Sequence, residues 1–260
     1  MMQLSVEILD HIFSFLVSHQ ETLIACSKDS LLSPIVERHL YYKAIVHIGK
    51  EQFNFNYVNA YKPNLLSKIV SENPRILRYV RILEIYVEFW SSQSEAHMGV
   101  LDEFAKTLLM FPVLECIMLT SSPFLQDWHW PNAFRAALED RLNFRTLKEL
   151  HLTGSKDLPF TVLENCKNIE DLSLLGTFEA EGLVGVSTLP HLKSLNLSTR
   201  FISSSLLTWL KLHITELQSL KSASASMYEL PVLFGECSGT LNKLEVDLTN
   251  TDCKSRVLLI

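Results

Sequence analysis

The histidine and acidic residues are the first place to look for catalysis, and their spacing gives one candidate pair. The nine histidines do not cluster, and no H-E-x-x-H, G-x-S-x-G, G-x-x-x-x-G-K-[ST] or G-x-G-x-x-G motif is present. His151 follows Glu149 by two residues in a segment with strand character, so the two side chains could act together as a general base. A polar pair on the exposed face of a strand has the same spacing, and we favour that interpretation. We therefore expect a protein that is not an enzyme and uses no cofactor.

The cysteines also form no recognisable motif. There are five, widely spaced, at Cys26, Cys116, Cys166, Cys237 and Cys253. Because no C-x-x-C pair occurs, the sequence predicts no metal site and no disulfide framework. A reduced, intracellular chain, cytoplasmic or nuclear, fits this cysteine usage best.

The charge and hydropathy of the chain argue against two further classes of protein. The net charge of −6 and the lack of a basic run argue against a nucleic-acid surface. Glu7 and Asp10 interrupt the apolar N-terminus and the first basic residue is Lys28, which is the reverse of a signal peptide. No run approaches the ~18 apolar residues of a membrane span. With 47% apolar and 20% charged residues in 260, the chain can hold a large core or two modules.

A repeated pattern of leucines must position any surface that this chain uses. An apolar-x-x-apolar-x-apolar pattern, called the leucine motif below, occurs three times between residues 147 and 197. The copies are Leu147-x-x-Leu150-x-Leu152, Ile169-x-x-Leu172-x-Leu174 and Leu192-x-x-Leu195-x-Leu197. Their starts are 22 and 23 residues apart, within the roughly 20–29 residues of a leucine-rich repeat. Since one strand and its return segment cannot bury their own apolar face, one unit implies a stack of neighbours.

The leucine motif extends in both directions with changed spacing. Copies begin at Val80 and Leu114 before this stretch and at Leu217 and Leu241 after it, and the copy at Leu217 has Ser222 in its last place. The early starts are 34 and 33 residues apart, so extra helix or loop must lie between those strands. The predicted helices are Pro63–Asn73, Leu101–Met110, Asn132–Arg141, Ser203–His213 and Met227–Cys237.

Alternation along each strand predicts which side chains face away from the leucines. If Leu150 and Leu152 point into the core, then Glu149 and His151 point to the opposite, concave face. The candidates for a substrate-binding face chosen in this way are Glu84, Tyr86, Glu149, His151, Asp171, Ser173, Asn196, Lys221 and Glu245. This face is mixed polar and mildly acidic, and extended concave faces of this kind usually bind other proteins.

The N-terminal residues Leu4–Leu16 predict a helix that is apolar over about half of its circumference. Ser5 is a plausible N-cap, and Glu7 lies in the first turn, where a negative charge is favourable. The apolar arc is wider than the ~100° that a surface helix needs. The helix therefore either inserts between two layers of its own domain, or packs one flank internally and presents the other to a partner.

Two shorter helices and a strand are predicted next. The second helix covers Thr22–Lys28, and the third opens with Ser33 as N-cap and Pro34 in the first helical position. Three short helices make a poor independent core, so this module should depend on docking to something else. Beyond them, Ala44–Ile48 predicts a strand that ends at Gly49.

The order of residues in this module resembles the F-box family. Leu4-Ser5-Val6-Glu7-Ile8-Leu9 followed by Ile12-Phe13-Ser14-Phe15-Leu16 looks like the opening of an F-box, and Ser33-Pro34-Ile35-Val36-Glu37-Arg38-His39-Leu40-Tyr41 resembles the third helix of F-box proteins common in fungi. The resemblance covers about residues 2–48. The chain departs from the family at Ser5, where proline is usual, and in the polar segment 28–30. Since serine supplies a cap in place of a rigid start, we expect the first helix to survive.

The resemblance implies a module that binds a Skp-type adaptor and, through it, the cullin scaffold of a cullin–RING (SCF-type) ubiquitin ligase. By position, the adaptor contact would be carried by Leu4, Val6, Ile8, Leu9, Ile12, Phe13 and Leu16. We expect some of these, such as Phe13 or Leu16, to lie partly in the internal core. The leucine motifs in turn resemble the divergent leucine-rich arrays that follow fungal F-boxes. The asparagine that regular arrays carry three residues past the motif is replaced by Ser122, Ser155, Thr177 and Arg200.

The sequence as a whole predicts an α/β protein with an N-terminal three-helix F-box over residues 1–48 and a helical bridge over 49–75. Residues 76–260 are expected to form an irregular leucine-rich-repeat solenoid with a parallel sheet on its concave face, and the apolar end Val257–Ile260 indicates a shortened array. The leading hypothesis is a substrate-recruiting ligase subunit whose repeats hold an unknown protein. The alternative is a leucine-rich interaction scaffold with no ubiquitin role, in which the chain itself covers the first helix.

Overall fold

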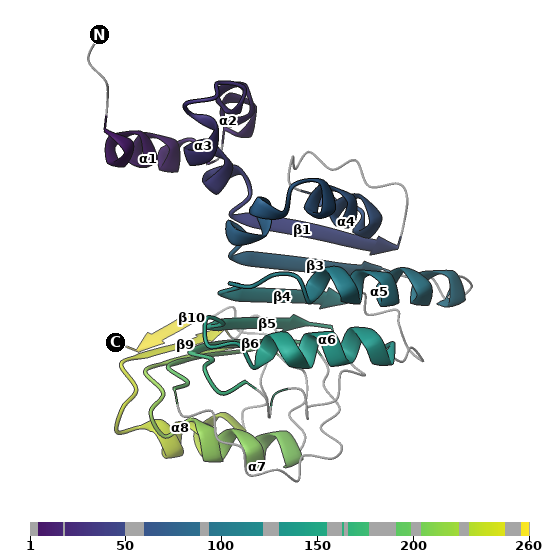
Figure 1. Cartoon of the computed structure of the whole chain (residues 1–260). Helices are drawn as coiled ribbons and strands as arrows, with labels where there is room; N and C mark the ends of the chain where they lie inside the picture. The colour runs from purple at the N-terminus through teal and green to yellow at the C-terminus, as the bar shows by residue number, and fades with distance from the viewer. Residues whose placement is uncertain are drawn as a thin grey trace.

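Three short helices lead into a sheet of ten strands backed by helices, which confirms the predicted α/β class (Figure 1). The computed structural model describes residues 5–17, 19–49, 60–88, 94–121, 130–154, 163, 166–176, 191–198, 204–223, 229–247 and 256–259. The described helices are α1 (Val6–Phe15), α2 (Gln20–Ser27), α3 (Ser33–Leu40), α4 (Pro63–Glu72), the 3-10 helix η1 (Pro74–Arg78), α5 (Ser94–Leu108), α6 (Asn132–Leu142), α7 (Ser204–His213) and α8 (Glu229–Cys237). None of these helices has the length and apolar character that crossing a membrane would require.

The strands follow one another across the sheet almost in chain order. They are β1 (Lys43–Gly49), β2 (Ala60–Tyr61), β3 (Ile82–Glu88), β4 (Cys116–Ser121), β5 (Glu149–Thr153), β6 (Asp171–Leu175), β7 (Ser194–Ser198), β8 (Ser219–Ala223), β9 (Lys243–Asp247) and β10 (Arg256–Leu259). Their order is β10-β9-β8-β7-β6-β5-β4-β3-β1-β2. Neighbouring strands from β2 to β9 are parallel, and β10 is antiparallel to β9. The predicted parallel sheet is therefore confirmed.

Each leucine motif forms one strand, from β3 to β9, and the predicted strand Ala44–Ile48 lies in β1. The strands β2 and β10 have no counterpart among the predicted strands. The backbone of β10 pairs with the outer edge of β9. Its side chains and residue 260 lie outside the description, so the shortened array stays a prediction. The four residues that replace the asparagines, at positions 122, 155, 177 and 200, also lie outside the described residues.

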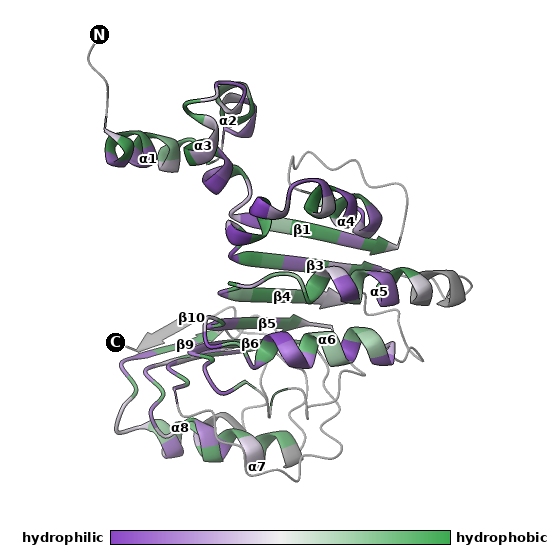
Figure 2. Ribbon diagram, viewed as in Figure 1, coloured by the Kyte–Doolittle hydropathy of each residue, from purple (hydrophilic) through white to green (hydrophobic). Residues whose placement is uncertain are grey.

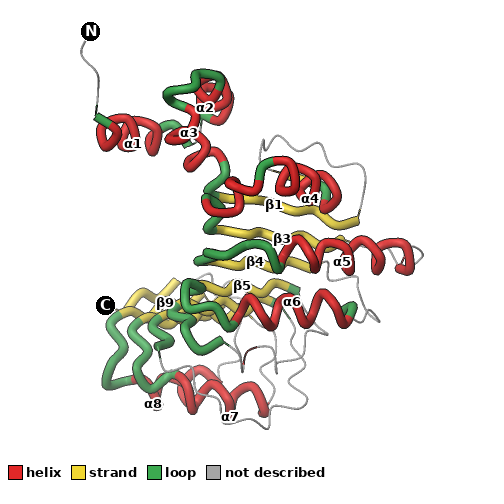
Figure 3. Tube along the Cα trace, viewed as in Figure 1, coloured by secondary structure: helices red, strands yellow, loops and turns green. Residues whose placement is uncertain are grey.

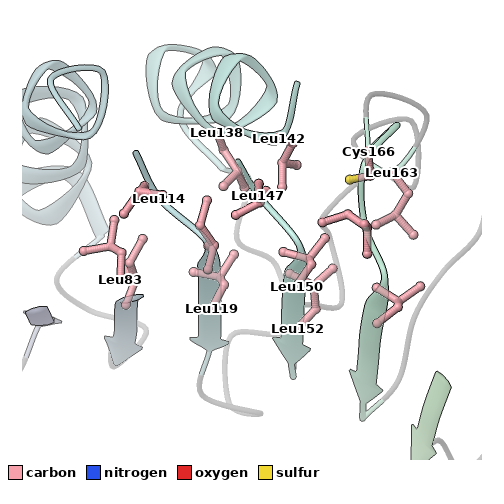
Figure 4. Packing of buried hydrophobic residues seen from close by; sticks show 14 of the residues in the cluster. Leu83, Leu114, Leu119, Leu138, Leu142, Leu147, Leu150, Leu152, Leu163 and Cys166 are labelled. Atoms are coloured by element: carbon pink, nitrogen blue, oxygen red, sulfur yellow. The ribbon is translucent and has the colours of Figure 1, made fainter. Parts of the chain in front are cut away.

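The leucine motifs stand in register across the sheet, so their equivalent residues are neighbours. Leu150 on β5 lies opposite Ile117 on β4 and Leu172 on β6. The full row is Leu83, Ile117, Leu150, Leu172, Leu195, Leu220 and Leu244. All of these side chains are buried, and Figure 4 shows Leu83 of β3 and Leu150 of β5 on the same side of the sheet. Because a shift of one residue would turn the whole row outward, the leucine motif fixes the register.

The helices cover the leucine side of the sheet and close its core. Figures 1 and 3 show α4, α5 and α6 along one face of the strands, with α7 and α8 farther along the same side. Phe104 of α5, Phe134 of α6 and Trp209 of α7 are buried in one cluster with the strand leucines. Figure 2 shows the apolar residues of strands β1, β3 and β4 that contribute to this layer. The five predicted helices correspond to α4–α8, except that α5 begins at Ser94 rather than at Leu101.

Gly49 ends β1 as predicted, and the close approach of β3 explains why the residue is glycine. Its φ is +127°, a value that other residues rarely adopt. A Cβ at this position would lie 1.7 Å from the carbonyl oxygen of Glu88 on β3. Glycine therefore lets β1 and β3 remain paired to their last residue.

A row of alternating charge runs along the ends at which the chain enters the strands. The row is Arg81, Glu115, Lys148, Glu170 and Lys193, and each backbone N–H donates to the carbonyl of the residue before it in the row. Arg81 Nε lies 3.1 Å from Glu115 Oε1, while Glu170 accepts hydrogen bonds from Lys148 Nζ at 2.5 Å and Lys193 Nζ at 2.7 Å. These two lysines lower the pKa of Glu170 to about 2. The row adds a match of charges to the register that the leucines set.

Helices α1–α3 have a small core of their own. Its buried members are Phe13, Leu23, Ile35, Val36 and Leu40. Asp10 of α1 holds α3 in place, because its Oδ1 lies 2.9 Å from Nε2 of His39 and 3.6 Å from Nη1 of Arg38. All three predicted helices are present.

The start of α3 differs from the prediction in one respect. Ser33 is the first residue of the helix, and the N-cap is Leu32. The Ser33 hydroxyl donates to Oε1 of Glu37 at 2.9 Å, four residues on, and so does not cap the backbone. Pro34 is therefore the second residue of the helix rather than the first, still within the first turn, where its missing N–H costs nothing.

The helical module and the sheet meet at Glu37 of α3 and at Tyr41, the residue that follows this helix. Glu37 is 8% exposed, and its Oε1 accepts a 2.7 Å hydrogen bond from Nη2 of Arg75 in η1. Tyr41 packs against both hydrophobic cores. Burial of the Tyr41 side chain is the main cause that raises the pKa of its hydroxyl, and the negative charge of Glu37 adds to this shift. The contact that joins the two parts thus combines a half-buried ion pair, in which Glu37 is buried and Arg75 is exposed, with a shared aromatic ring.

Candidate functional site

The first helix begins with the cap that the sequence predicts. The Ser5 hydroxyl accepts a hydrogen bond from the N–H of Ile8 at 3.4 Å. Glu7 lies in the first turn, and a backbone hydrogen bond together with the Ser5 hydroxyl lowers the pKa of its carboxyl. The helix is therefore retained although Ser5 replaces the usual proline, as expected.

The inner flank of α1 packs on the module's own core. Phe13 is 4% exposed, in contact with the cluster that α2 and α3 supply, while Leu9 and Leu16 are partly buried against the same cluster. Phe13 therefore belongs to the internal core, as expected for part of the set, and its ring, enclosed by Leu23 and its neighbours, is not available to an adaptor. Leu9 and Leu16 can reach a partner only with the edges that remain exposed.

The outer flank of α1 is apolar and exposed. Val6, Ile8, Ile12 and Phe15, called the outer stripe below, are 56%, 48%, 42% and 69% exposed. Ile8, Ile12 and Phe15 follow the i, i+4, i+7 spacing of a single helix face. Figure 1 shows α1 at the end of the molecule, away from the sheet. A single exposed apolar side chain is ordinary, but four on one short helix are typical of an interaction surface.

Sequence reasoning chose this face only in part. Val6, Ile8 and Ile12 are among the predicted adaptor-binding residues, whereas Leu4 lies outside the described residues. Phe15 is the most exposed member of the outer stripe and is absent from that set. The missed signal was the position of Phe15 around the helix axis, since at ~100° per residue Phe15 lies on the same face as Ile8.

At the β1–β3 end of the sheet, the predicted substrate face is already occupied by internal contacts. Glu84 is 8% exposed, forms an ion pair with Lys43 on β1, and accepts a 2.5 Å hydrogen bond from the Tyr86 hydroxyl. His47 stacks on the Tyr86 ring, with 4.6 Å between the ring centroids. Burial lowers the pKa of His47, and the Glu84 carboxylate opposes this shift. The expectation that Glu84 is free to bind substrate is therefore wrong, because β1 supplies its partner.

Ser173 is a second correction on the same face. It is 2% exposed, although alternation alone would expose it. Its register partners are His151 and Asn196, whose longer side chains flank it on either side. A short side chain between two longer ones is covered even on the outer face of a sheet.

The other predicted face residues keep exposed surface. Glu149 is exposed, and the partly exposed members are Tyr86, His151, Asp171, Asn196, Lys221 and Glu245. Lys221 and Glu245 lie opposite each other on β8 and β9, with 3.4 Å between Nζ and Oε1. These residues remain candidates for a surface that binds a protein.

Glu149 and His151, the two residues considered as a general base, lie beside Cys116, which sequence reasoning missed. His151 Nε2 is 3.7 Å from Glu149 Oε2, and Cys116 on β4 is the register partner of Glu149. Burial, followed by the charge of Glu149, raises the pKa of the Cys116 thiol to about 12. The signal was available, because Cys116 and Glu149 each stand two residues after the first leucine of their own motif.

Comparison with known proteins adds no assignment. No protein-family model matches the chain, and neither a curated protein nor a solved structure matches it significantly. The function is therefore argued from the surfaces described above.

Proposed function

We propose that this chain is the substrate-recruiting subunit of a cullin–RING ubiquitin ligase. In this proposal helices α1–α3 are an F-box that binds a Skp-type adaptor. The sheet with its covering helices is a divergent leucine-rich-repeat solenoid that holds a protein substrate. The protein has no catalytic role of its own and acts by raising the concentration of substrate beside the ligase.

The outer stripe of α1 is the observation that carries the proposal. A three-helix module with five buried apolar side chains has little internal stability to spare, yet it leaves Ile8, Ile12 and Phe15 in water. Covering each such side chain is worth about 1.5–3 kcal/mol, so a partner on this face gains affinity and stabilises the module. This matches the docking role that the F-box resemblance implies.

The register of the leucine motifs supports the repeat part of the proposal. Seven successive strands place the same motif position in one buried row, as a stacked repeat requires. The polar face on the other side of the strands offers Glu149, Asp171, Asn196 and Lys221 to a substrate.

A leucine-rich scaffold with no ubiquitin role is the alternative. In that case the chain itself should cover the apolar arc of the first helix. Over the described residues, Ile8, Ile12 and Phe15 remain 42–69% exposed. We therefore favour the recruiter.

The test is binding of the full chain to a purified Skp-type adaptor, measured by calorimetry. We expect a one-to-one complex that the double variant Ile12→Asp with Phe15→Asp weakens at least about 30-fold, because two apolar contacts at the centre of an interface become buried charges. Both side chains are exposed, so the folded chain should tolerate the change, which circular dichroism verifies.

Leu212→Asp is the matched control, since Leu212 is 61% exposed on α7, far along the chain from the stripe. It should leave adaptor affinity unchanged. Lack of binding by the wild-type chain, or equal binding by the double variant, would remove the ligase role and leave the scaffold.

A further inference from the structure

Three side chains with different ligand atoms meet on the polar face of the sheet. They are Cys116 on β4 with Glu149 and His151 on β5. The thiol sulfur, a carboxylate oxygen and an imidazole nitrogen all lie within 4.8 Å of one another. This cluster lies on two middle strands of the sheet, apart from the outer stripe on α1, and has no part in adaptor binding.

The fold fixes this meeting in two ways. Cys116 and Glu149 are register partners on adjacent parallel strands, so their Cα atoms are held one strand spacing apart. Glu149 and His151 are two residues apart on one strand, so their side chains leave the same face. The backbone that carries all three residues belongs to the leucine-fixed register and cannot shift without exposing the core.

The ligand types suit zinc. Zn²⁺ is bound by cysteine sulfur, histidine nitrogen and carboxylate oxygen, usually as a tetrahedron with bonds of about 2.0–2.3 Å. Such a tetrahedron separates its ligand atoms by about 3.3–3.8 Å. His151 Nε2 and Glu149 Oε2 are already 3.7 Å apart. Closing the other distances from 4.8 Å or less takes only side-chain rotation of Glu149 and His151, which are not enclosed.

The charges around the cluster favour a cation. Asp171 on β6 is the register partner of Glu149 and adds a second carboxylate beside it. Lys43 on β1 is the cation that acts on Cys116, and its ammonium is paired with the carboxylate of Glu84. The neighbours Met118 and Ile82, which lie opposite His151 and Cys116, carry no charge. A divalent ion would therefore enter a site of net negative charge.

We propose that Cys116, Glu149 and His151 bind one Zn²⁺ ion through three protein ligands and leave its fourth position open. Cys116 is 4% exposed and forms the floor of the site, whereas Glu149 is exposed and His151 partly so. A three-ligand site with an open position accepts water or one further donor. The ion clips β4 to β5 on the face opposite the leucines.

Sequence reasoning predicts no metal site, because it looks for ligands that are close along the chain. Cys116 and Glu149 are 33 residues apart and adjacent in space. Parallel strands bring such residues together by register, without any short motif.

The test uses the full chain, stripped of metal with a chelator, and titrated with Zn²⁺ alone or with Co²⁺ as a spectroscopic probe. We expect one ion per chain and, with Co²⁺, a sulfur-to-cobalt charge-transfer band that reports a thiolate ligand. Cys116→Ser should abolish the band. His151→Gln and Glu149→Gln should weaken Zn²⁺ binding by more than the roughly 10–100-fold that loss of an outer-sphere partner costs.

Matched controls come from the same chain. Cys26→Ser removes a partly exposed thiol on α2, His11→Gln an exposed imidazole on α1, and Glu245→Gln a carboxylate elsewhere on the sheet face. Each control should leave affinity and band unchanged. Absence of stoichiometric Zn²⁺ binding, a band that persists in Cys116→Ser, or equal affinity in His151→Gln and wild type would each overturn the site.

Discussion

The helical module and the sheet treat their apolar residues in opposite ways. In the sheet, the leucine-motif side chains are buried strand after strand, and the exposed large apolar residues, such as Leu65 and Leu212, sit on the outer faces of the helices. In the helical module, one short helix exposes Val6, Ile8, Ile12 and Phe15 together. Neighbouring units cover each other's apolar side chains in the sheet, whereas no other described part of the chain covers the outer stripe of the module.

This difference teaches where stability and binding reside. The sheet gains stability from nearest-neighbour stacking, so its strength is shared along the row. Among the described residues, the module has a core of five buried apolar side chains, and the ion pair between Glu37 and Arg75 of η1 ties it to the rest of the chain. It should open locally before the sheet does, and its exposed helix should add little to stability.

The largest expected effect separates the two flanks of α1. Phe13→Ala removes a ring that is 4% exposed and should cost about 3–5 kcal/mol, enough to unfold α1–α3 while the sheet stays folded. Hydrogen exchange should show protection lost in α1–α3 and kept in β4–β6. Phe15→Ala, on a residue 69% exposed, is the control and should change stability by no more than about 0.5 kcal/mol. Equal loss of protection in both variants would break the comparison.

The next effect tests the stacking of the sheet. Leu150→Ala empties a fully buried position in the central row and should cost about 2–5 kcal/mol. Because each unit is stabilised by packing against its neighbours, chemical denaturation should show a lower midpoint for the sheet as a whole. Leu212→Ala makes the same chemical change on a residue 61% exposed and should shift the midpoint hardly at all. A midpoint unchanged by Leu150→Ala would contradict the shared core.

A smaller effect should appear at the contact between the two regions. Arg75→Ala leaves the Glu37 carboxylate, whose side chain is 11% exposed, without its cationic partner, at a cost of about 1–3 kcal/mol. Exchange protection in α3 should fall while that of β5 and β6 holds. Lys68→Ala removes an ion pair with Glu72 that is exposed on both sides and should have no measurable effect. Uniform loss of protection in both regions would show that they unfold as one.

The smallest effect concerns the charge row at the strand entrances. Folding lowers the pKa of Glu170 from 4.5 to about 2, so its contribution to stability is present above pH 4.5 and is lost as the pH falls toward 2. The Glu170 side chain is 31% exposed and both lysines lie at the surface, where water screens the ion pairs, so the contribution is only about 0–1 kcal/mol. The stability difference between wild type and Glu170→Gln should shrink over this range, while Glu236→Gln on α8 should show no such trend. A difference that is constant with pH would rule out the two lysine bonds.

The repeating part of the fold could be predicted from the sequence, because its signal is local and periodic. Alternation placed the strands, and the common spacing of the leucine motif placed Leu150 beside Ile117 and Leu172. The two-residue strand β2 carries no such pattern, and the apolar run of β10 does not reveal that it pairs antiparallel to β9.

The candidate sites could be predicted less well, because burial of a face depends on what lies next to it. The width of the apolar arc indicated that α1 has a free flank, but only the positions of α2 and α3 decide that Phe13 lies inside and Phe15 outside. Glu84 was expected to be free because the strand pattern does not reveal that Lys43 lies beside it. Ser173 was expected to be exposed because alternation ignores the length of the neighbouring side chains.

The alternating charges at Arg81, Glu115, Lys148, Glu170 and Lys193 carry a consequence for how such a protein can grow. Copying one unit within this stretch would set lysine beside lysine or glutamate beside glutamate, and the newcomer would repel its neighbour. Copying two adjacent units keeps every basic side chain of the row next to an acidic one. An array with this edge is therefore lengthened or shortened most smoothly in pairs, by evolution or by an engineer.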